Sequence, residues 1–396
     1  MNLKNILIAV LFIASMQWTH AQGIEFFEGS WDDAKMEAAK NEKLIFVDAY
    51  TSWCGPCRKL KKVVFPQKKA GDFFNKHFIS LSLDLEKRKG LIFSLYYDIR
   101  AYPTLLYMDA NGDIIKKDLG FRDVHRLVKE AGNVIDLYYN PDKLEEKIKV
   151  AKSNKYYVKL LVNALYRQNK DYITRLNKYI ANYKLSKNHG LRLKYECLVT
   201  AGDELYDEIL EPQNLDFLYE VYGKDKVDSR LYTILTRDFE KAVYSGDKKK
   251  IKMLTKKARK IPFISSQALK IYKKLLKAKA HNDYNAFASL SQKYFQKLKN
   301  DAVKREFIKY LYGKTVGGKS VDALSLQLSE ALAKQNPGFD NNVLLIEIAV
   351  LNGEYDKARP LINEAIGIAK KNKDFSTKLK LKRFRKFMYR NKIKRQ

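Results

Sequence analysis

Two cysteines separated by two residues constrain this chain most strongly. They stand in the run Trp53-Cys54-Gly55-Pro56-Cys57. The apolar run Leu44–Tyr50 before them is typical of a buried strand, and the basic stretch Arg58–Val64 after them is typical of a helix. A strand that ends in this motif and turns into a helix places Cys54 at the helix N-terminus, where the helix dipole and free N–H groups favour a thiolate. A thiolate beside a second thiol is the reactive unit of a disulfide exchanger.

The alternative use of such a pair is a zinc site, which needs four ligands. The chain has one further Cys, Cys197, and no His cluster flanks the motif. Redox chemistry is therefore favoured, and we predict neither a metal nor a cofactor. Cys197 lies in the stretch Leu191–Ala201, which is typical of a helix, and we interpret it as a buried, inert thiol rather than a third redox centre.

Residues 24–131, approximately, resemble the thioredoxin superfamily, because four features occur in the family's order. Trp53-Cys54-Gly55-Pro56-Cys57 is the family's active-site pentapeptide. Asp48 lies six residues before the first Cys, at the position of the family's buried proton-handling acid. Tyr102-Pro103-Thr104 begins the next long apolar run, as the family's cis-proline loop does, and Asn111-Gly112-Asp113 supplies a hairpin turn.

The resemblance implies roles for the residues of the dithiol site. Cys54 would be the exposed thiolate that attacks a client disulfide, and Cys57 would resolve the mixed disulfide and pair with Cys54. Asp48, a carboxylate inside an apolar strand, would accept the Cys57 proton through water; the alternative is an Asp that faces the edge of the sheet. Ser80 or Ser82 stands near where the family carries a Lys partner for that acid, so proton handling at Asp48 is expected to differ.

The resemblance also implies a client-binding surface. Its expected members are Trp53, Gly55, Pro56, Tyr102 and Pro103. The Tyr102–Pro103 peptide bond is expected to be cis, so that the backbone N–H and C=O of Tyr102 lie beside the dithiol and pair with an extended client. Two alternatives stay open: Trp53 contacts the client or packs on its neighbours, and Tyr102 gates access or packs.

Residues 1–21 have the pattern of a secretory signal peptide. Lys4 supplies the positive charge, Ile6–Met16 is an apolar segment too short for a comfortable membrane span, and Thr19-His20-Ala21 fits a cleavage site. The alternative is an uncleaved anchor. The stretch Val64–Phe74 also looks closer to exported thioredoxin-like and disulfide-interchange reductase domains than to small cytosolic thioredoxin.

The signal-peptide pattern predicts that the protein is periplasmic or otherwise exported, and therefore lies in an oxidising compartment. The dithiol then needs a redox partner, such as a membrane disulfide reductase, or else acts as an oxidant. The expected clients are exported proteins with disulfides, and nucleic acid is not expected as a partner.

Charge divides the chain near Asn140-Pro141. Residues 22–140 carry a net charge of +2, whereas residues 141–396 carry +28 of the total of +31. A break of this size predicts a domain boundary, with an α/β thioredoxin-like domain over 22–140 and an all-helical domain over 141–396.

The apolar pattern of the first domain predicts a mixed sheet flanked by helices. Besides the active-site helix, we expect strands over Leu44–Tyr50, Phe78–Asp84, Thr104–Met108 and Ile114–Leu119, and helices over Trp31–Asn41, Ala70–His77, Gly90–Tyr97 and Val124–Ala131.

In the second domain the pattern predicts amphipathic helices, such as Val158–Tyr166, Leu231–Tyr244, Ser266–Ala278 and Val343–Leu351. Turn-like breaks recur every 35 or 36 residues, at Gly246-Asp247, Asn282-Asp283, Gly317-Gly318 and Gly353-Glu354. This period, together with a likeness of Glu354–Ala358 to a tetratricopeptide helix, predicts a helical-repeat solenoid; the alternative is a non-repetitive bundle.

Two functions follow from these expectations. The first is an exported thiol-disulfide oxidoreductase whose helical domain holds or selects the client. The alternative is a helical adaptor whose thioredoxin-like domain is a redox sensor or a tether. The run Lys378–Arg395 contains ten Lys and Arg and no acid. One interpretation is a site for an anionic membrane surface or an acidic partner, and the alternative is a solvated face, as charge runs usually are.

Overall fold

The structure is a computed structural model that describes residues 23–150, 155–314 and 319–393. Its contacts divide the chain between Tyr139 and Asn140 into two compact units, called unit 1 (1–139) and unit 2 (140–396). The predicted signal peptide over 1–21 and the predicted turn at Gly317-Gly318 lie outside the described residues.

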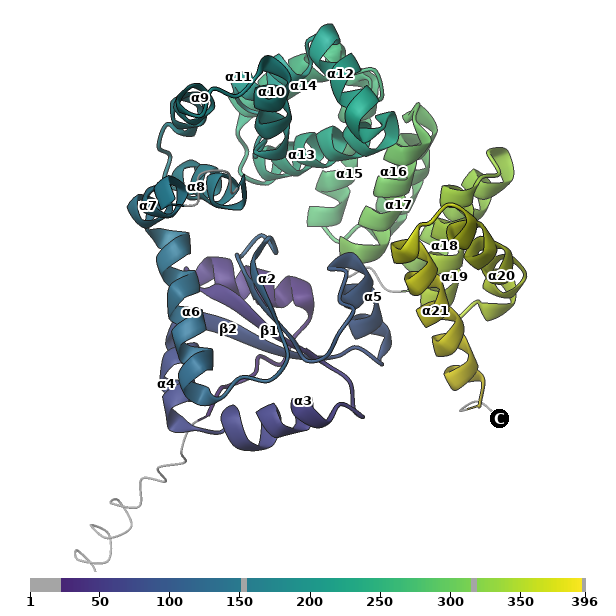
Figure 1. The fold of residues 1–396 in the computed structure, drawn as a ribbon. Coiled ribbons are helices and arrows are strands. Elements are labelled where there is room, and N and C mark those ends of the chain that lie inside the picture. The colour runs from purple at the N-terminus through teal and green to yellow at the C-terminus, as the bar shows by residue number, and fades with distance from the viewer. Residues whose placement is uncertain (1–22, 151–154, 315–318, 394–396) are drawn as a thin grey trace, which may run out of the picture. The chain divides into compact units, whose positions relative to one another are not determined.

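Unit 1 is an α/β domain built on a four-stranded mixed sheet (Figure 1). The strand order is β2-β1-β3-β4, with β1 parallel to β2 and antiparallel to β3, and β3 antiparallel to β4. The strands are β1 (Leu44–Tyr50), β2 (Phe78–Asp84), β3 (Thr104–Met108) and β4 (Ile114–Leu119). The four predicted strands are thus confirmed with the predicted bounds.

The helices of unit 1 follow the predicted order with shifted ends. They are α2 (Trp31–Lys40), α3 (Gly55–Lys59), the π-helical turn η1 (Leu60–Val64), α4 (Lys68–His77), α5 (Arg88–Tyr96) and α6 (Val124–Tyr139). The last helix continues past the predicted end at Ala131, because Val134 is buried and the Tyr139 hydroxyl donates a hydrogen bond to the backbone oxygen of Glu42. The predicted active-site helix widens into a π-helical turn after Lys59.

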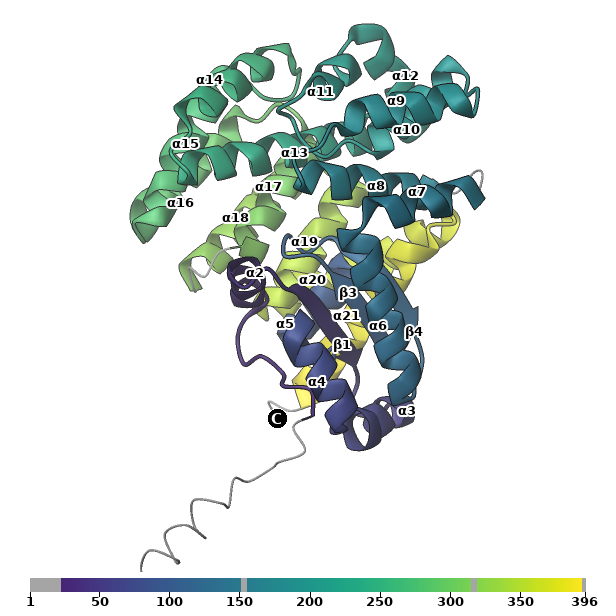
Figure 2. The same cartoon turned by 90° about the vertical axis from the view of Figure 1, so that its left-hand side faces the viewer.

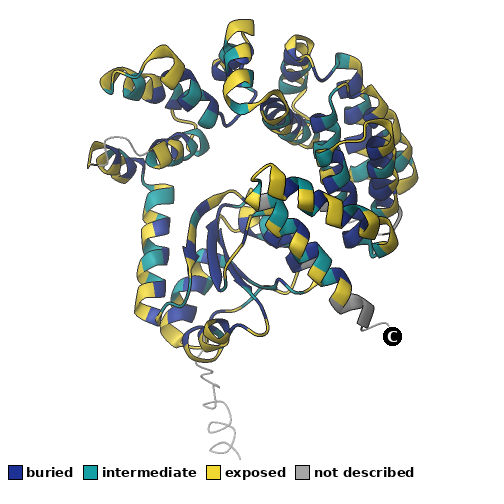
Figure 3. Ribbon diagram, turned by 45° about the vertical axis from the view of Figure 1, so that its right-hand side comes forward, coloured by how far each residue is buried: buried dark blue, intermediate teal, exposed yellow. Residues whose placement is uncertain are grey.

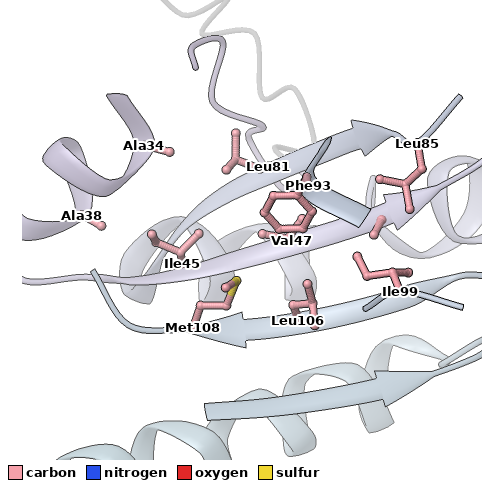
Figure 4. Close-up of a cluster of buried hydrophobic side chains, with 11 residues drawn as sticks. Ala34, Ala38, Ile45, Val47, Leu81, Leu85, Phe93, Ile99, Leu106 and Met108 are labelled. Carbon is pink, nitrogen blue, oxygen red and sulfur yellow. The ribbon is translucent and has the colours of Figure 1, made fainter. Parts of the chain in front are cut away.

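One face of the sheet carries a mainly aliphatic core (Figure 4). Alternate residues of β1 point to the same side, so Ile45, Val47 and Ala49 all enter this core. They pack with Ala34 of α2 and Phe93 of α5. Because β1 is an interior strand buried on both faces, its sequence is a continuous apolar run rather than an alternating one.

The opposite face of the sheet carries an aromatic core. Phe46 of β1 lies at the centre of edge-to-face or tilted contacts with Phe65, Phe74 and Tyr107, with ring centroids 4.7 to 6.2 Å apart. In Figure 3 the central strands are accordingly coloured as buried. Asp48 follows Phe46 by two residues and therefore lies on this face, which gives a carboxylate an apolar setting.

The described residues of unit 2 form helices. They are α7 (Pro141–Val150), α8 (Lys155–Arg167), α9 (Tyr172–Asn182), α10 (Lys187–Glu196), α11 (Glu204–Ile209), α12 (Pro212–Tyr222), α13 (Lys224–Tyr244), α14 (Lys248–Lys257), the 3-10 turn η2 (Ala258–Lys260), α15 (Ser266–Ala280), α16 (Tyr284–Lys297), α17 (Asp301–Lys314), α18 (Lys319–Gln335), α19 (Phe339–Asn352), α20 (Tyr355–Lys371) and α21 (Phe375–Ile393).

Helices that follow one another in unit 2 mostly pack together, as α15 and α16 do in both ribbon views (Figures 1 and 2). Helices two apart also touch, namely α13 with α15, α16 with α18, α17 with α19, and α19 with α21. The turns at Gly246-Asp247, Asn282-Asp283 and Gly353-Glu354 each separate two of these helices. A helical repeat remains a prediction.

The predicted helix over Leu191–Ala201 is wrong in its second half. Helix α10 ends at Glu196, and Cys197 is its C-cap. The backbone beyond it is bound by side chains of α13: the Asp238 carboxylate accepts the N–H of Ala201, and Arg237 donates to the carbonyl oxygen of Val199. These long-range bonds replace the helical ones.

Candidate active site

The two cysteines of the motif form a disulfide at the start of α3. The Cα atoms of Cys54 and Cys57 are 5.3 Å apart, and their sulfurs are bonded. Cys54 is the N-cap of the helix, and its Sγ accepts a hydrogen bond of 3.2 Å from the backbone N–H of Cys57. Pro56 lies in the first turn, where its fixed φ suits a helix start. The helix N-terminus thus faces the sulfur that is expected to carry the negative charge.

The disulfide is less exposed than the sequence led us to expect. Cys54 is 4% exposed and Cys57 is 1% exposed, so both are buried in the oxidised state. The order of exposure agrees with Cys54 as the attacking cysteine, but the expected exposed position is corrected to a nearly covered one. The space beside Gly55, which follows Cys54, is open, because a Cβ built at Gly55 would meet no atom within 4 Å.

The third cysteine is remote from this chemistry. Cys197 is buried, and burial raises the pKa of its thiol to about 12. A thiol in this state is neutral at physiological pH, which suits the predicted inert role.

A cis peptide bond joins Tyr102 to Pro103, as predicted. The N–H of Gly120 donates a 2.9 Å hydrogen bond to the carbonyl oxygen of Pro103, which ties this loop to the segment after β4. The ring of Tyr102 lies edge-on to Trp53, with centroids 5.7 Å apart. Trp53 remains 59% exposed, so it packs on Tyr102 and still presents surface to solvent. The motif and the proline loop are thereby brought together.

Asp48 is a fully buried carboxylate on the central strand. It is 0% exposed, which overturns the alternative of an Asp facing the sheet edge. Its register partner on β2 is Ser82, whose hydroxyl donates a 3.1 Å hydrogen bond to Asp48 Oδ2. Oδ1 has no hydrogen-bond partner among the described residues. Burial raises the pKa of Asp48 from 3.8 to about 6, against the opposing pull of Lys61 and the Ser82 hydroxyl.

Lys61 is the site residue that the sequence reasoning missed. It belongs to the π-helical turn η1, and its Nζ lies 3.1 Å from the ring centroid of Tyr50, two residues beyond Asp48 on the same face of β1. The positive charge of Lys61 lowers the pKa of Asp48. A cation near the buried acid therefore comes from the active-site helix, while the β2 position holds Ser82. The absence of a Lys from β2 was the sequence feature that indicated a cation from another segment.

The loop before the motif is held by polar contacts. The Glu86 carboxylate accepts hydrogen bonds from the backbone N–H and the hydroxyl of Ser52. On the other side, Arg58 Nη1 donates a 3.0 Å hydrogen bond to the backbone oxygen of Ser52. These contacts hold the residues that lead into Cys54.

Among the described residues, no three or more His, Cys, Asp and Glu side chains are grouped so that they could hold a metal ion. Among the helices that the structure describes, none is both long enough and apolar enough to cross a bilayer.

Comparison with known proteins places residues 27–110 in a family described as thioredoxin-like. A solution structure of a candidate disulphide isomerase from Bacteroides thetaiotaomicron is 40% identical and covers 29% of this chain and 96% of that one, with a TM-score of 0.27. The thiol:disulfide interchange protein DsbD of Pseudoalteromonas atlantica is 26% identical over 107 residues, which are 26% of this chain and 18% of DsbD.

Thioredoxins of plants are also similar. Thioredoxin H4-1 of Oryza sativa is 31% identical over 97 residues, so the chain spans 64% of that relative. Thioredoxin H9 of Arabidopsis thaliana is 32% identical over 111 residues, which are 27% of this chain and 71% of that relative. With this likeness, the thioredoxin-like fold of unit 1 and the paired cysteines at the start of α3, the chain belongs to the thioredoxin family through its N-terminal unit.

Proposed function

We propose that this protein is an exported thiol-disulfide oxidoreductase that reduces or isomerises disulfides of other exported proteins. The observation that carries the proposal is the Cys54–Cys57 pair at the N-terminus of α3, where the helix end stabilises a thiolate. The cis Tyr102–Pro103 bond beside Trp53 supports a client strand bound next to the pair.

The reaction proceeds in two exchange steps. In the reduced protein the Cys54 thiolate attacks one sulfur of the client disulfide, which forms a mixed disulfide and releases one client thiolate. The Cys57 thiolate then attacks Cys54 Sγ, which forms the Cys54–Cys57 disulfide and releases the second client thiolate. Two electrons pass to the client, and the two thiolates take up protons. Isomerisation results when a released client thiolate attacks the mixed disulfide first.

Asp48 serves the second step. Cys57 is neutral until it attacks, and its proton needs an acceptor. With a pKa of about 6, Asp48 is mostly ionised at neutral pH and is basic enough to take that proton, directly or through water. Lys61 and Ser82 hold this acceptor in its charged form.

Export rests on the signal-peptide pattern of residues 1–21. In an oxidising compartment the pair needs a dithiol partner, such as a membrane disulfide reductase, to return it to the reduced state. Unit 2 holds or selects the client in this proposal.

The decisive test is disulfide reduction by the full chain from residue 22. We expect reduction of insulin with dithiothreitol as the electron source, and loss of that activity in Cys54→Ser. The matched control is Cys197→Ser, which removes the third thiol and should keep the activity. Activity that survives in Cys54→Ser would refute the assignment of the nucleophile.

Trapping identifies the clients. Cys57→Ser should accumulate mixed disulfides between Cys54 and exported proteins, which reductant releases, because the resolving thiol is gone. Cys54→Ser/Cys57→Ser is the control and should trap none. Absence of adducts in Cys57→Ser would contradict the role of Cys57 as resolving cysteine.

The second candidate is a helical adaptor, favoured by the size and the charge of +28 of residues 141–396. It predicts that Cys54→Ser keeps both client binding and the cellular phenotype. The oxidoreductase predicts that client binding is kept while the phenotype is lost.

A further inference from the structure

We propose that the surface around the dithiol selects acidic clients, namely extended protein segments in which Asp or Glu residues flank the disulfide. The inference rests on the proposed oxidoreductase function and adds the chemistry of its substrate. The selecting residues are Arg58, Lys59 and Lys62, which are defined as the basic collar.

The charge of the active-site segment is one-sided. Residues 51–71 contain six Lys and Arg and no Asp or Glu, although residues 22–140 as a whole have a net charge of only +2. The positive charge of this domain is therefore concentrated on the segment that carries the dithiol. A balanced solvated surface would intersperse both signs.

The basic collar is open to a partner. Arg58, Lys59 and Lys62 are all exposed. Among the residues that the structure describes, no Asp or Glu side chain forms an ion pair with any of the three. Their charges are thus available to a client, in contrast to Lys68, which pairs with Asp72 at 2.8 Å.

Two members of the collar are tied to the borders of the dithiol site. Arg58 follows Cys57 directly, and its guanidinium reaches back to the Ser52 backbone oxygen, two residues before Cys54. Lys59 lies over the ring of Phe121, with Nζ 4.7 Å from the centroid. Phe121 follows Gly120, whose N–H is bonded to Pro103.

Arg58 is therefore bonded to the loop before Cys54, and Lys59 contacts the segment that is bonded to the cis-proline loop. Glu86 is bonded to the segment 51–71 through Ser52, and Asp72 pairs with Lys68, so each of these carboxylates offsets one positive charge. The six positive charges of the segment still exceed these two negative ones.

Exposed charges act mainly on the rate of encounter and on the choice of partner. Single exposed pairs are weak, but a cluster of like charges beside a reactive group raises association rates of oppositely charged partners by about 10-fold or more at low salt. Salt screens this attraction, with a Debye length of about 10 Å at 0.1 M. Preference for an acidic client should therefore fall as salt rises.

The test uses three synthetic peptides of equal length with the same central disulfide, flanked by Glu, Gln or Lys. The reduced full chain is mixed with each peptide, and the second-order rate constant of Cys54–Cys57 oxidation is measured in a single turnover. We expect the Glu peptide to react at least about five times faster than the Lys peptide in 20 mM salt, with the Gln peptide between them. The ratio of the Glu-peptide to the Lys-peptide rate constant should fall towards one in 0.5 M salt.

The variant Lys59→Glu/Lys62→Glu should lower the ratio to one or below. It leaves Arg58 and its bond to Ser52 in place. The matched control is Lys40→Glu, because Lys40 is an exposed residue before the N-terminal end of β1, whereas the dithiol follows the C-terminal end. This control should keep the wild-type ratio.

The ratio of the Glu-peptide to the Lys-peptide rate constant tests the acidic-client proposal separately from the proposed oxidoreductase function. A charge change in the collar also alters the reactivity of Cys54 itself, but that effect is common to all three peptides and cancels in the ratio of their rate constants. Reduction of all three peptides at equal rates would overturn the acidic-client proposal and leave the oxidoreductase intact. No reduction of any peptide would overturn the proposed function itself. A small anionic disulfide, dithiodipropionate, that reacts as fast as the Glu peptide would refute an extended protein segment as the occupant.

Discussion

Asp48 should make unit 1 less stable as pH rises, and Asp48→Asn should remove that loss. The carboxylate is fully buried, and its pKa in the folded protein is about 6 against 3.8 for an unperturbed Asp. A group with a raised folded-state pKa stabilises the fold only while it is protonated. Below pH 3.8 both states hold the proton and nothing is lost; between pH 3.8 and 6 the folded state holds more protons, so stability falls as pH rises.

The size of the effect follows from the shift. A difference of about two pH units corresponds to about 3 kcal/mol of unfolding free energy that is lost above pH 6. About 2 kcal/mol of this loss develops between pH 4 and pH 8. The amide of Asn places an N–H donor in a site where Asp48 Oδ1 has no protein partner, which costs about 1–3 kcal/mol at every pH. Because this cost is the same at every pH, it does not affect how the difference in unfolding free energy between the two proteins changes with pH.

Urea unfolding of the oxidised full chain, followed by tryptophan fluorescence, measures the effect. The three tryptophans of the sequence are Trp18, Trp31 and Trp53, so their emission reports on unit 1 and is silent on unit 2. Between pH 4 and pH 8, the unfolding free energy of Asp48→Asn should rise by about 2 kcal/mol relative to that of the wild-type protein. Lys40→Ala, an exposed change on α2, is a control and should follow the wild-type pH profile. A difference that is constant with pH, or that shrinks as pH rises, would refute a raised pKa at Asp48.

Three further predictions test other parts of the site and its support. In the reduced protein at pH 7, iodoacetamide should label Cys54 well before Cys197, because one thiol caps a helix and the other has a pKa of about 12; peptide mass mapping that finds Cys197 first would contradict this. Lys61→Met removes the charge that lowers the pKa of Asp48, so the pH profile of insulin reduction should move to higher pH, and an unmoved profile would exclude electrostatic coupling between the two. Leu106→Ala, at a fully buried core position, should cost about 2–5 kcal/mol in the same fluorescence assay, whereas a loss below 1 kcal/mol would mean that the core can close around the cavity.

Much of unit 1 was predictable because its signals are local. The strand Leu44–Tyr50 is an apolar run bounded by polar residues, and the motif that follows it specifies the turn into a helix. Such patterns depend on neighbours within a few residues, so they survive without knowledge of the fold. The bounds of α6 were less predictable, since its last turns are stabilised by contacts such as that of Tyr139 with Glu42, 97 positions away.

In unit 2, local pattern failed where distant side chains compete for the backbone. The stretch after Glu196 mixes good and poor helix formers, and Asp238 and Arg237 of α13 bind its N–H and carbonyl groups. Helix propensity is weak compared with such tertiary hydrogen bonds, so the helix ends at Glu196.

The sequence by itself determined the chemistry: two thiols at a helix start, an acid six residues before them and a proline loop that follows. Tertiary structure alone decided the electrostatics. Lys61 belongs to η1 and not to the sheet, yet it lies over the ring of Tyr50 and its charge lowers the pKa of Asp48. Whether a carboxylate in a strand is buried, and which cation approaches it, depends on packing between segments that are not neighbours in sequence, and no local pattern records that packing.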